Sequence, residues 1–103
     1  MLKYKFVRIV IYENKGPGLK LDGFVEKLHR YMRRKRTNEP PLLEDGTVTY
    51  FLRNGLRATV YPMKGNGSLE MRVEGEEARF KKAVESMRSV YSGPIVIQYL
   101  TPV

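Results

Sequence analysis

The sequence of 103 residues contains no cysteine, no tryptophan and only one histidine, His29. The absence of cysteine excludes disulfides, zinc ribbons and thiolate clusters, and it excludes cysteine catalysis. A histidine metal site needs several ligands at suitable spacing, and His29 has no second histidine or cysteine to share a metal with. We therefore expect neither a metal nor a cofactor, and we interpret His29 as a surface or interface residue.

Long apolar runs are also missing. No run approaches the ~18 residues of a membrane span, so we expect no membrane partner. The first residues, MLKYKFVRIVIYENK, begin basic and then apolar, but Lys15 and a Gly-Pro turn stand where a signal peptide would have small residues. We interpret this stretch as a strand and expect a cytoplasmic, intracellular protein. The length and the 42% content of hydrophobic residues fit one domain, residues 1–103.

Acidic residues are in the minority: 11 stand against 19 lysines and arginines, a formal net charge of +8. No pair of carboxylates has the spacing of a general acid–base motif. The glycine-bearing stretches GPGLKLDG and GNGS match neither the dinucleotide fingerprint nor the phosphate-binding loop. We therefore predict that the protein is not an enzyme. Its basic charge favours DNA, RNA or another acidic partner.

Hydrophobic periodicity predicts two helices. From Leu21 to Met32, apolar side chains recur at i, i+3, i+4, i+7 and i+11, which indicates an amphipathic helix over residues 21–36. A second apolar stripe predicts a helix over residues 76–91. The paired prolines of residues 37–46 predict a loop. Runs rich in β-branched and aromatic residues predict five strands: residues 3–12, the two arms of a hairpin within 47–62, residues 68–75 and residues 95–100.

These elements predict an α+β domain of the order β-α-β-β-β-α-β, with one antiparallel sheet and two helices on one of its faces. Asn54 and Gly55 are the usual pair for a two-residue type I′ hairpin turn, which would place Phe51 opposite Ala58. In that register both faces of the hairpin carry large apolar groups. Something must then cover the second face, and we expect a homodimer, the commonest kind of oligomer.

The densest charge feature is a basic run at the end of the first predicted helix. It has more cations than the helix dipole needs, and like charges this close repel one another. We predict that the run contacts nucleic-acid phosphates, with a solvated helix end as the alternative. The run comprises Arg30, Arg33, Arg34, Lys35 and Arg36.

Aromatic and basic side chains alternate along the predicted strands. On an open sheet such side chains stack on bases or enter a groove. The candidates are Phe6 and Arg8 of the first strand and Arg57 and Tyr61 of the hairpin. The alternatives are that these residues belong to the core, or that a second subunit or another protein covers them.

Three stretches between residues 19 and 87 resemble one repeat of the TATA-box-binding protein family: LKLDGF, NEPPLLEDG and ATVYPMKGNGSLEMRVEGEEARFKKAVESM. The resemblance implies a curved antiparallel sheet with helices on its convex side. It also implies DNA binding in which paired apolar wedges kink the duplex through the minor groove. Leu43 and Tyr61 stand at the wedge positions. Glu74 replaces a neutral groove-facing threonine, so the resemblance does not imply recognition of a TATA promoter.

The sequence thus predicts a small, basic, non-enzymatic module that binds nucleic acid through its basic helix end, its aromatic sheet face or both. The alternative is a protein-interaction module that holds a partner polypeptide on the sheet face or in a groove.

Overall fold

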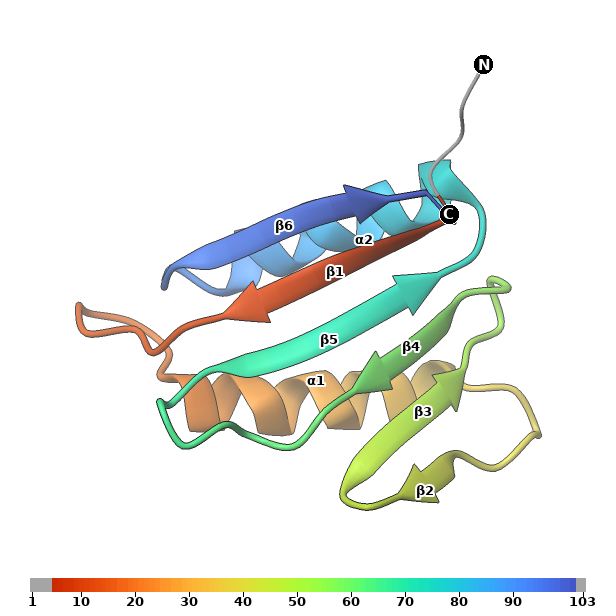
Figure 1. Cartoon of the computed structure of the whole chain (residues 1–103), viewed down its shortest axis with the longest axis horizontal. Coiled ribbons are helices and arrows are strands. Elements are labelled where there is room, and N and C mark those ends of the chain that lie inside the picture. Colours follow the sequence, from red (N-terminus) through yellow and green to blue (C-terminus); the bar gives the residue numbers. More distant parts are fainter. Residues whose placement is uncertain (1–4, 102–103) are drawn as a thin grey trace.

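A computed structural model describes residues 5–101 of the chain (Figure 1). Six strands form one open antiparallel sheet in the order β2-β3-β4-β5-β1-β6, and both helices lie on one face of it. The predicted α+β class, with a single antiparallel sheet and two helices on one side, is confirmed. The elements are β1 (Phe6–Ile11), α1 (Leu21–Lys35), β2 (Leu42–Glu44), β3 (Thr47–Phe51), β4 (Arg57–Val60), β5 (Leu69–Glu74), α2 (Glu77–Val90) and β6 (Ile95–Leu100).

Strand β2 lies in residues 37–46, which were predicted to be a loop, so that prediction was wrong for Leu42–Glu44. It has three residues and pairs with β3 across the two-residue turn Asp45-Gly46. Both turn residues have positive φ, 51° for Asp45 and 80° for Gly46, as a type I′ turn requires. The strand is too short to show an alternation of polar and apolar residues. Both of its leucines are exposed, so no buried face marks it either. The Asp-Gly pair was the available signal for it.

The second hairpin does not adopt the predicted two-residue turn. Phe51 pairs with Arg57, one residue away from the predicted register. The loop holds three residues, Arg53 to Gly55, since the Leu52 N–H donates to the Leu56 carbonyl across it. Within it the Gly55 N–H donates to the Leu52 carbonyl, and of the loop residues only Gly55, with φ of 86°, is left-handed. A type I turn followed by a left-handed residue is the usual three-residue hairpin loop. Asn54 stabilises it by accepting the Leu56 N–H at its side-chain oxygen, at 3.1 Å.

This shift of one residue changes which side chains share a face of the hairpin. A one-residue change of register moves a whole strand's side chains to the other face. Val48 and Tyr50 share the helix side with Ala58 and Val60, while the opposite face carries Thr49, Thr59, Phe51, Arg57 and Tyr61. The hairpin therefore has one apolar face and one mixed face, on which Phe51 and Tyr61 stand among polar residues. The homodimer stays a prediction.

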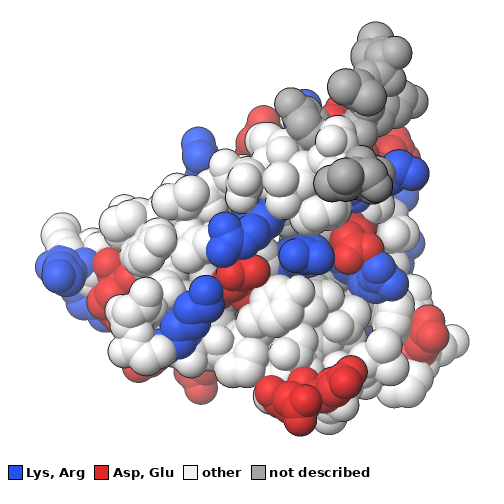
Figure 2. All heavy atoms as spheres, in the orientation of Figure 1, with Lys and Arg blue, Asp and Glu red and all other residues white. Residues whose placement is uncertain are grey.

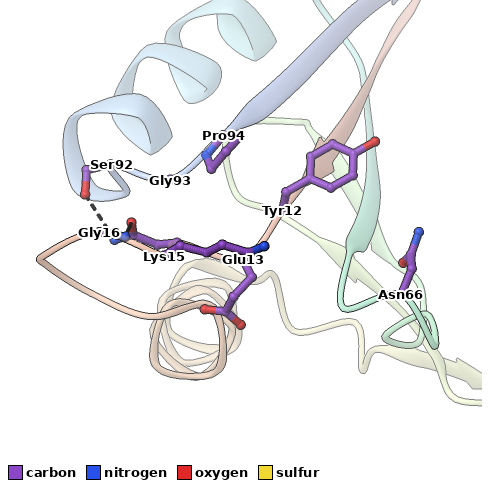
Figure 3. Close-up of a pocket in the computed structure, with 9 residues that line it drawn as sticks. Tyr12, Glu13, Lys15, Gly16, Asn66, Ser92, Gly93 and Pro94 are labelled. Atoms are coloured by element: carbon purple, nitrogen blue, oxygen red, sulfur yellow. Dashed lines mark hydrogen bonds between the residues drawn. The ribbon is translucent and has the colours of Figure 1, made fainter.

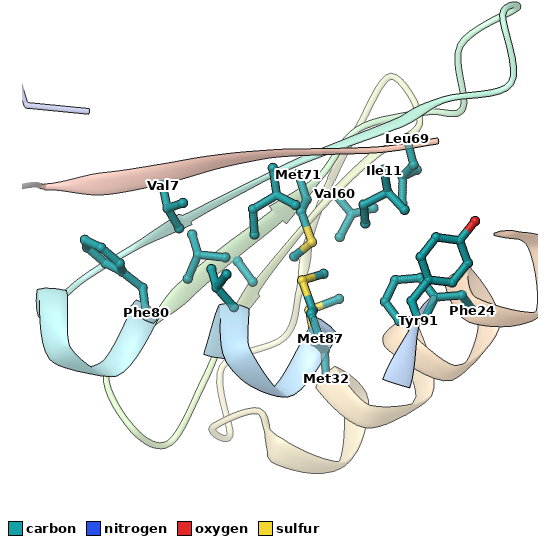
Figure 4. Packing of buried hydrophobic residues seen from close by; sticks show 14 of the residues in the cluster. Val7, Ile11, Phe24, Met32, Val60, Leu69, Met71, Phe80, Met87 and Tyr91 are labelled. Atoms are coloured by element: carbon teal, nitrogen blue, oxygen red, sulfur yellow. The ribbon is translucent and has the colours of Figure 1, made fainter. Parts of the chain in front are cut away.

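The core fills the space between the helices and the sheet (Figure 4). Val7, Ile9 and Ile11 of β1 and Phe80 of α2 are fully buried. Figure 4 shows Met32 of α1 and Met87 of α2 meeting beneath Met71 of β5, where flexible thioethers fill the irregular gap between two helices and a sheet. No helix within residues 5–101 is long and apolar enough to cross a membrane.

Candidate nucleic-acid interface

The carboxyl end of α1 is joined to the β3–β4 hairpin by main-chain hydrogen bonds. Thr37 N–H donates to the Phe51 carbonyl at 2.7 Å, and Arg53 N–H donates to the Lys35 carbonyl at 3.0 Å. Arg36 and Leu52 form an isolated antiparallel bridge. Helix ends leave carbonyls without intrahelical partners, and here the hairpin supplies a partner for one of them. The contact holds Arg53 beside the basic run of α1.

Three arginines surround a small hollow at this junction, which we call the arginine pocket. Its volume is about 200 Å³, and it is lined by Arg33, Arg36, Thr37, Asn38 and Arg53. Arg36 Nη1 donates to the Thr37 carbonyl at 3.1 Å, and Arg53 Nε donates to the Arg36 carbonyl at 3.2 Å. A guanidinium has five N–H donors in a fixed plane, so these bonds orient both groups and leave donors for an oxyanion.

The basic surface around this pocket is not neutralised by carboxylates. None of the ion pairs formed among residues 5–101 includes any member of the basic run or Arg53. Lys35 Nζ lies 6.0 Å from the centre of the Tyr31 ring, above its face. Arg30, Arg33, Arg34 and Lys35 are all exposed on the last turns of α1. The predicted basic residues are therefore together in space, and the structure adds Arg53 to them.

His29 connects α1 to the sheet. Its Nδ1 lies 2.8 Å from the Tyr50 hydroxyl, and its side chain is half-buried between α1 and β3. Burial lowers the pKa of His29 below its ordinary value of 6.5, and the nearby Arg33 charge lowers it further. His29 is thus neutral at neutral pH, as a hydrogen-bonded structural histidine.

We expect the free energy of unfolding to fall as the pH drops below about 6.5, the ordinary pKa of histidine. The unfolded chain then binds a proton at His29 more readily than the folded chain does, so protonation favours unfolding. Urea titrations between pH 5 and pH 7.5 measure this dependence. His29→Gln keeps a hydrogen-bonding side chain without a titrating ring, so its stability should vary less over this range. An equal slope in both proteins would show that another group causes it.

The open face of the sheet, which faces away from the helices, holds the candidates Phe6, Arg8, Arg57 and Tyr61. Here basic groups are paired with acids. Arg8 Nη2 lies 2.9 Å from Glu70 Oε1, which Lys64 Nζ also approaches at 3.5 Å, and Arg57 pairs with Glu74. The hydrogen bond from Arg8 lowers the pKa of Glu70, so its carboxylate stays charged. Figure 2 shows blue and red groups interleaved across this face.

Phe6 is partly covered by a neighbour on the same face. The Arg72 guanidinium lies 4.6 Å from the centre of the Phe6 ring, and Arg72 Nε is buried with no hydrogen-bond partner among the described residues. One side of the ring is therefore occupied by a cation–π contact. Sequence reasoning missed Arg72, although its place between Met71 and Val73 on an alternating strand was a signal for the open face.

No protein-family model matches this chain, and neither does any curated protein or solved structure.

The wedge positions implied by the TATA-box-binding resemblance are not brought together. Leu43 is 76% exposed on edge strand β2 and pairs with Val48, whose side chain points to the helix side. Tyr61 follows β4 on the open face, where its N–H donates to the Glu70 carbonyl. The pairing register thus assigns the two side chains to opposite faces of the sheet.

A larger hollow, of about 720 Å³, lies at the far end of β1 (Figure 3). Its lining includes Asn14, which is buried and fully engaged by the chain itself. The Asn14 amide nitrogen donates to the carbonyls of Pro17 and Leu19 and approaches the Ser92 hydroxyl, and its oxygen accepts the Gly16 N–H. Within residues 5–101, no three acidic or histidine side chains gather as metal ligands. The arginine pocket is therefore the best candidate site.

Proposed function

We propose that the protein is a non-enzymatic module that binds a nucleic acid by holding backbone phosphates at the arginine pocket. The observation that supports this best is the convergence of Arg33, Arg36 and Arg53 on one small polar hollow without a neutralising carboxylate. The planar guanidinium fork matches a phosphate in two-point hydrogen bonds, which makes arginine the preferred residue for this contact.

Arg30 and Arg34 are exposed and extend the same surface along α1, while Lys35 lies over Tyr31 on another side of the helix. Residues three or four apart in a helix lie on neighbouring turns, so a strand that enters the pocket beside Arg33 would pass Arg30 and Arg34 next. Contacts to phosphate carry no sequence information. We therefore expect affinity for DNA and RNA backbones with little preference for base sequence.

Fluorescence anisotropy with labelled single-stranded and duplex DNA and RNA tests this function. We expect binding at low salt, and a logarithm of affinity that falls linearly with the logarithm of salt concentration, because each contacted phosphate releases condensed cations. Absence of binding to all four probes at about 50 mM salt would contradict the proposal, as would binding that salt does not weaken.

A second candidate is a polypeptide partner on the open face. The paired charges of that face favour it, since Glu70 and Glu74 lie on the central strand β5 and would repel phosphates. Tyr61→Ala tests whether nucleic acid uses this face instead of the arginine pocket. If bases stack on this face, the change should cost roughly 1–3 kcal/mol of nucleic-acid binding. We expect unchanged nucleic-acid affinity in the same anisotropy assay.

A further inference from the structure

Strand β6 leaves one edge of the sheet open. Among the described residues it pairs with β1 alone, and its sequence IVIQYL contains no charge and no proline. Natural sheets protect exposed edges with charges, prolines, bulges or covering segments. Tyr12 N–H donates to the Pro94 carbonyl, which sets the antiparallel alternation. By that alternation the main-chain groups of Ile95 and Ile97 point away from β1. This edge therefore has the features of a surface that pairs with another strand.

The apolar core also continues to this edge without being closed there. Ile9 and Ile11 of β1 are fully buried, but their partners on β6, Ile97 and Ile95, are only partly buried. Val96, on the other face of β6, is 53% exposed. A strand added beside β6 would complete the burial of these side chains.

The flank of α2 next to β6 carries charges of alternating sign. Lys81 belongs to this flank, because its Nζ lies 5.4 Å from the centre of the Tyr99 ring on β6. Lys81 also pairs with Glu77 at 3.8 Å. Spacings of three and four residues keep side chains on one side of a helix. In chain order, the charged residues on this flank are Glu77, Lys81, Glu85 and Arg88.

We infer that the β6 edge binds a second copy of this chain, with the two β6 strands antiparallel about a two-fold axis near Ile97. The two sheets of six strands would then form one of twelve. The two α2 helices would run side by side in opposite directions. Glu77 would face Arg88 of the partner subunit, and Lys81 would face Glu85 of the partner subunit.

The charge pattern argues for a second copy over any other extended chain. An isologous interface must be complementary to its own reverse. The signs minus, plus, minus, plus become plus, minus, plus, minus on reversal, so each of the four charges meets an opposite one. The centre of the pattern lies between Lys81 and Glu85. Tyr99, near the end of β6, contacts Phe80 and Lys81 near the start of α2, and the two elements run in opposite directions. Ile97, two residues before Tyr99, therefore lies about four helix residues further along α2, close to that centre. Strand and helix thus agree on one axis.

Analytical ultracentrifugation without nucleic acid tests this interface independently of the proposed function. We expect a dimer at tens of micromolar. Lys81→Glu should raise its dissociation constant about tenfold or more, because it places like charges opposite each other twice per dimer. Lys82→Glu makes the same charge change on the exposed side of α2 and should leave dimerisation unchanged.

Exchanging the two charges provides the decisive variant. Lys81→Glu combined with Glu85→Lys restores opposite charges across the axis, so its dissociation constant should return to within about threefold of the parent value. A parent protein that is monomeric at about 200 μM would overturn the inference. So would equal effects of Lys81→Glu and Lys82→Glu, or an exchange variant as weak as Lys81→Glu.

Discussion

Replacement of Arg33, Arg36 and Arg53 together by glutamine is expected to weaken nucleic-acid binding roughly 100-fold at ~0.1 M salt. These three guanidiniums line the arginine pocket from two segments, the end of α1 with its C-cap residue Arg36 and the β3–β4 loop. Each phosphate contact contributes close to one unit of salt dependence, so the slope of log affinity against log salt should flatten by about two to three units. The loss should be alike for different base sequences. Fluorescence anisotropy over a salt series measures both quantities.

The matched control is a triple change of exposed lysines outside the pocket: Lys5, Lys15 and Lys82 to glutamine, which removes the same net charge. We expect a much smaller loss of affinity from it. Equal losses in the two triple variants would mean that overall charge, not the pocket, causes binding. Arg53 and Arg36 also bond to main-chain carbonyls, so thermal melts must establish that the arginine variant is folded.

Phe80→Ala is expected to lower the free energy of unfolding by about 3–5 kcal/mol. Phe80 is 0% exposed and stacks on Tyr99, with ring centres 6.0 Å apart. Its removal leaves a cavity between α2 and the sheet that rigid neighbours refill only in part. Since domains of this size are stable by about 5–15 kcal/mol, the variant should be close to unfolding. Urea titration measures the loss.

Phe51→Ala is the control for that prediction, because Phe51 is only partly buried and lies on the open face. Its loss of stability should be clearly smaller, since less apolar area returns to water. If the two alanine variants were equally stable, the placement of the main core between the helices and the sheet would be wrong.

The two helices were predictable from the sequence almost to the residue. The expected ranges 21–36 and 76–91 compare with Leu21–Lys35 and Glu77–Val90. Both helices carry an apolar stripe of helical period. Since the stripe must be buried against the sheet, its extent in the sequence indicates where each helix begins and ends. The α+β class followed from the same periodicity.

The hairpin register was not predictable from its turn sequence. Asn54-Gly55 and Asp45-Gly46 carry equivalent local signals, yet only the second forms a type I′ turn. The burial of Tyr50 and Ala58 on one face decides the register of the β3–β4 hairpin, and that is a tertiary effect. The alternation of apolar and polar residues within each strand did carry this information, since pairing Val48 and Tyr50 with Val60 and Ala58 puts apolar residues on one face.

The arginine pocket was predictable only in part for the same reason. The basic run is visible in the sequence, but Arg53 lies 17 residues beyond Arg36. The bridge between Arg36 and Leu52 brings them together, and it depends on the three-residue loop and on the end of α1. No local pattern encodes a contact between a helix end and a hairpin.

The most direct test of the central claim is an NMR titration of the protein with a short single-stranded oligonucleotide, observing main-chain amides and arginine Nε–H groups together. If phosphates are held at the arginine pocket, the Nε–H signals of Arg33, Arg36 and Arg53 and the amides of Thr37 and Asn38 will shift with increasing oligonucleotide. Shifts confined to the open face of β1, β4 and β5, with the arginine pocket unchanged, would contradict the account.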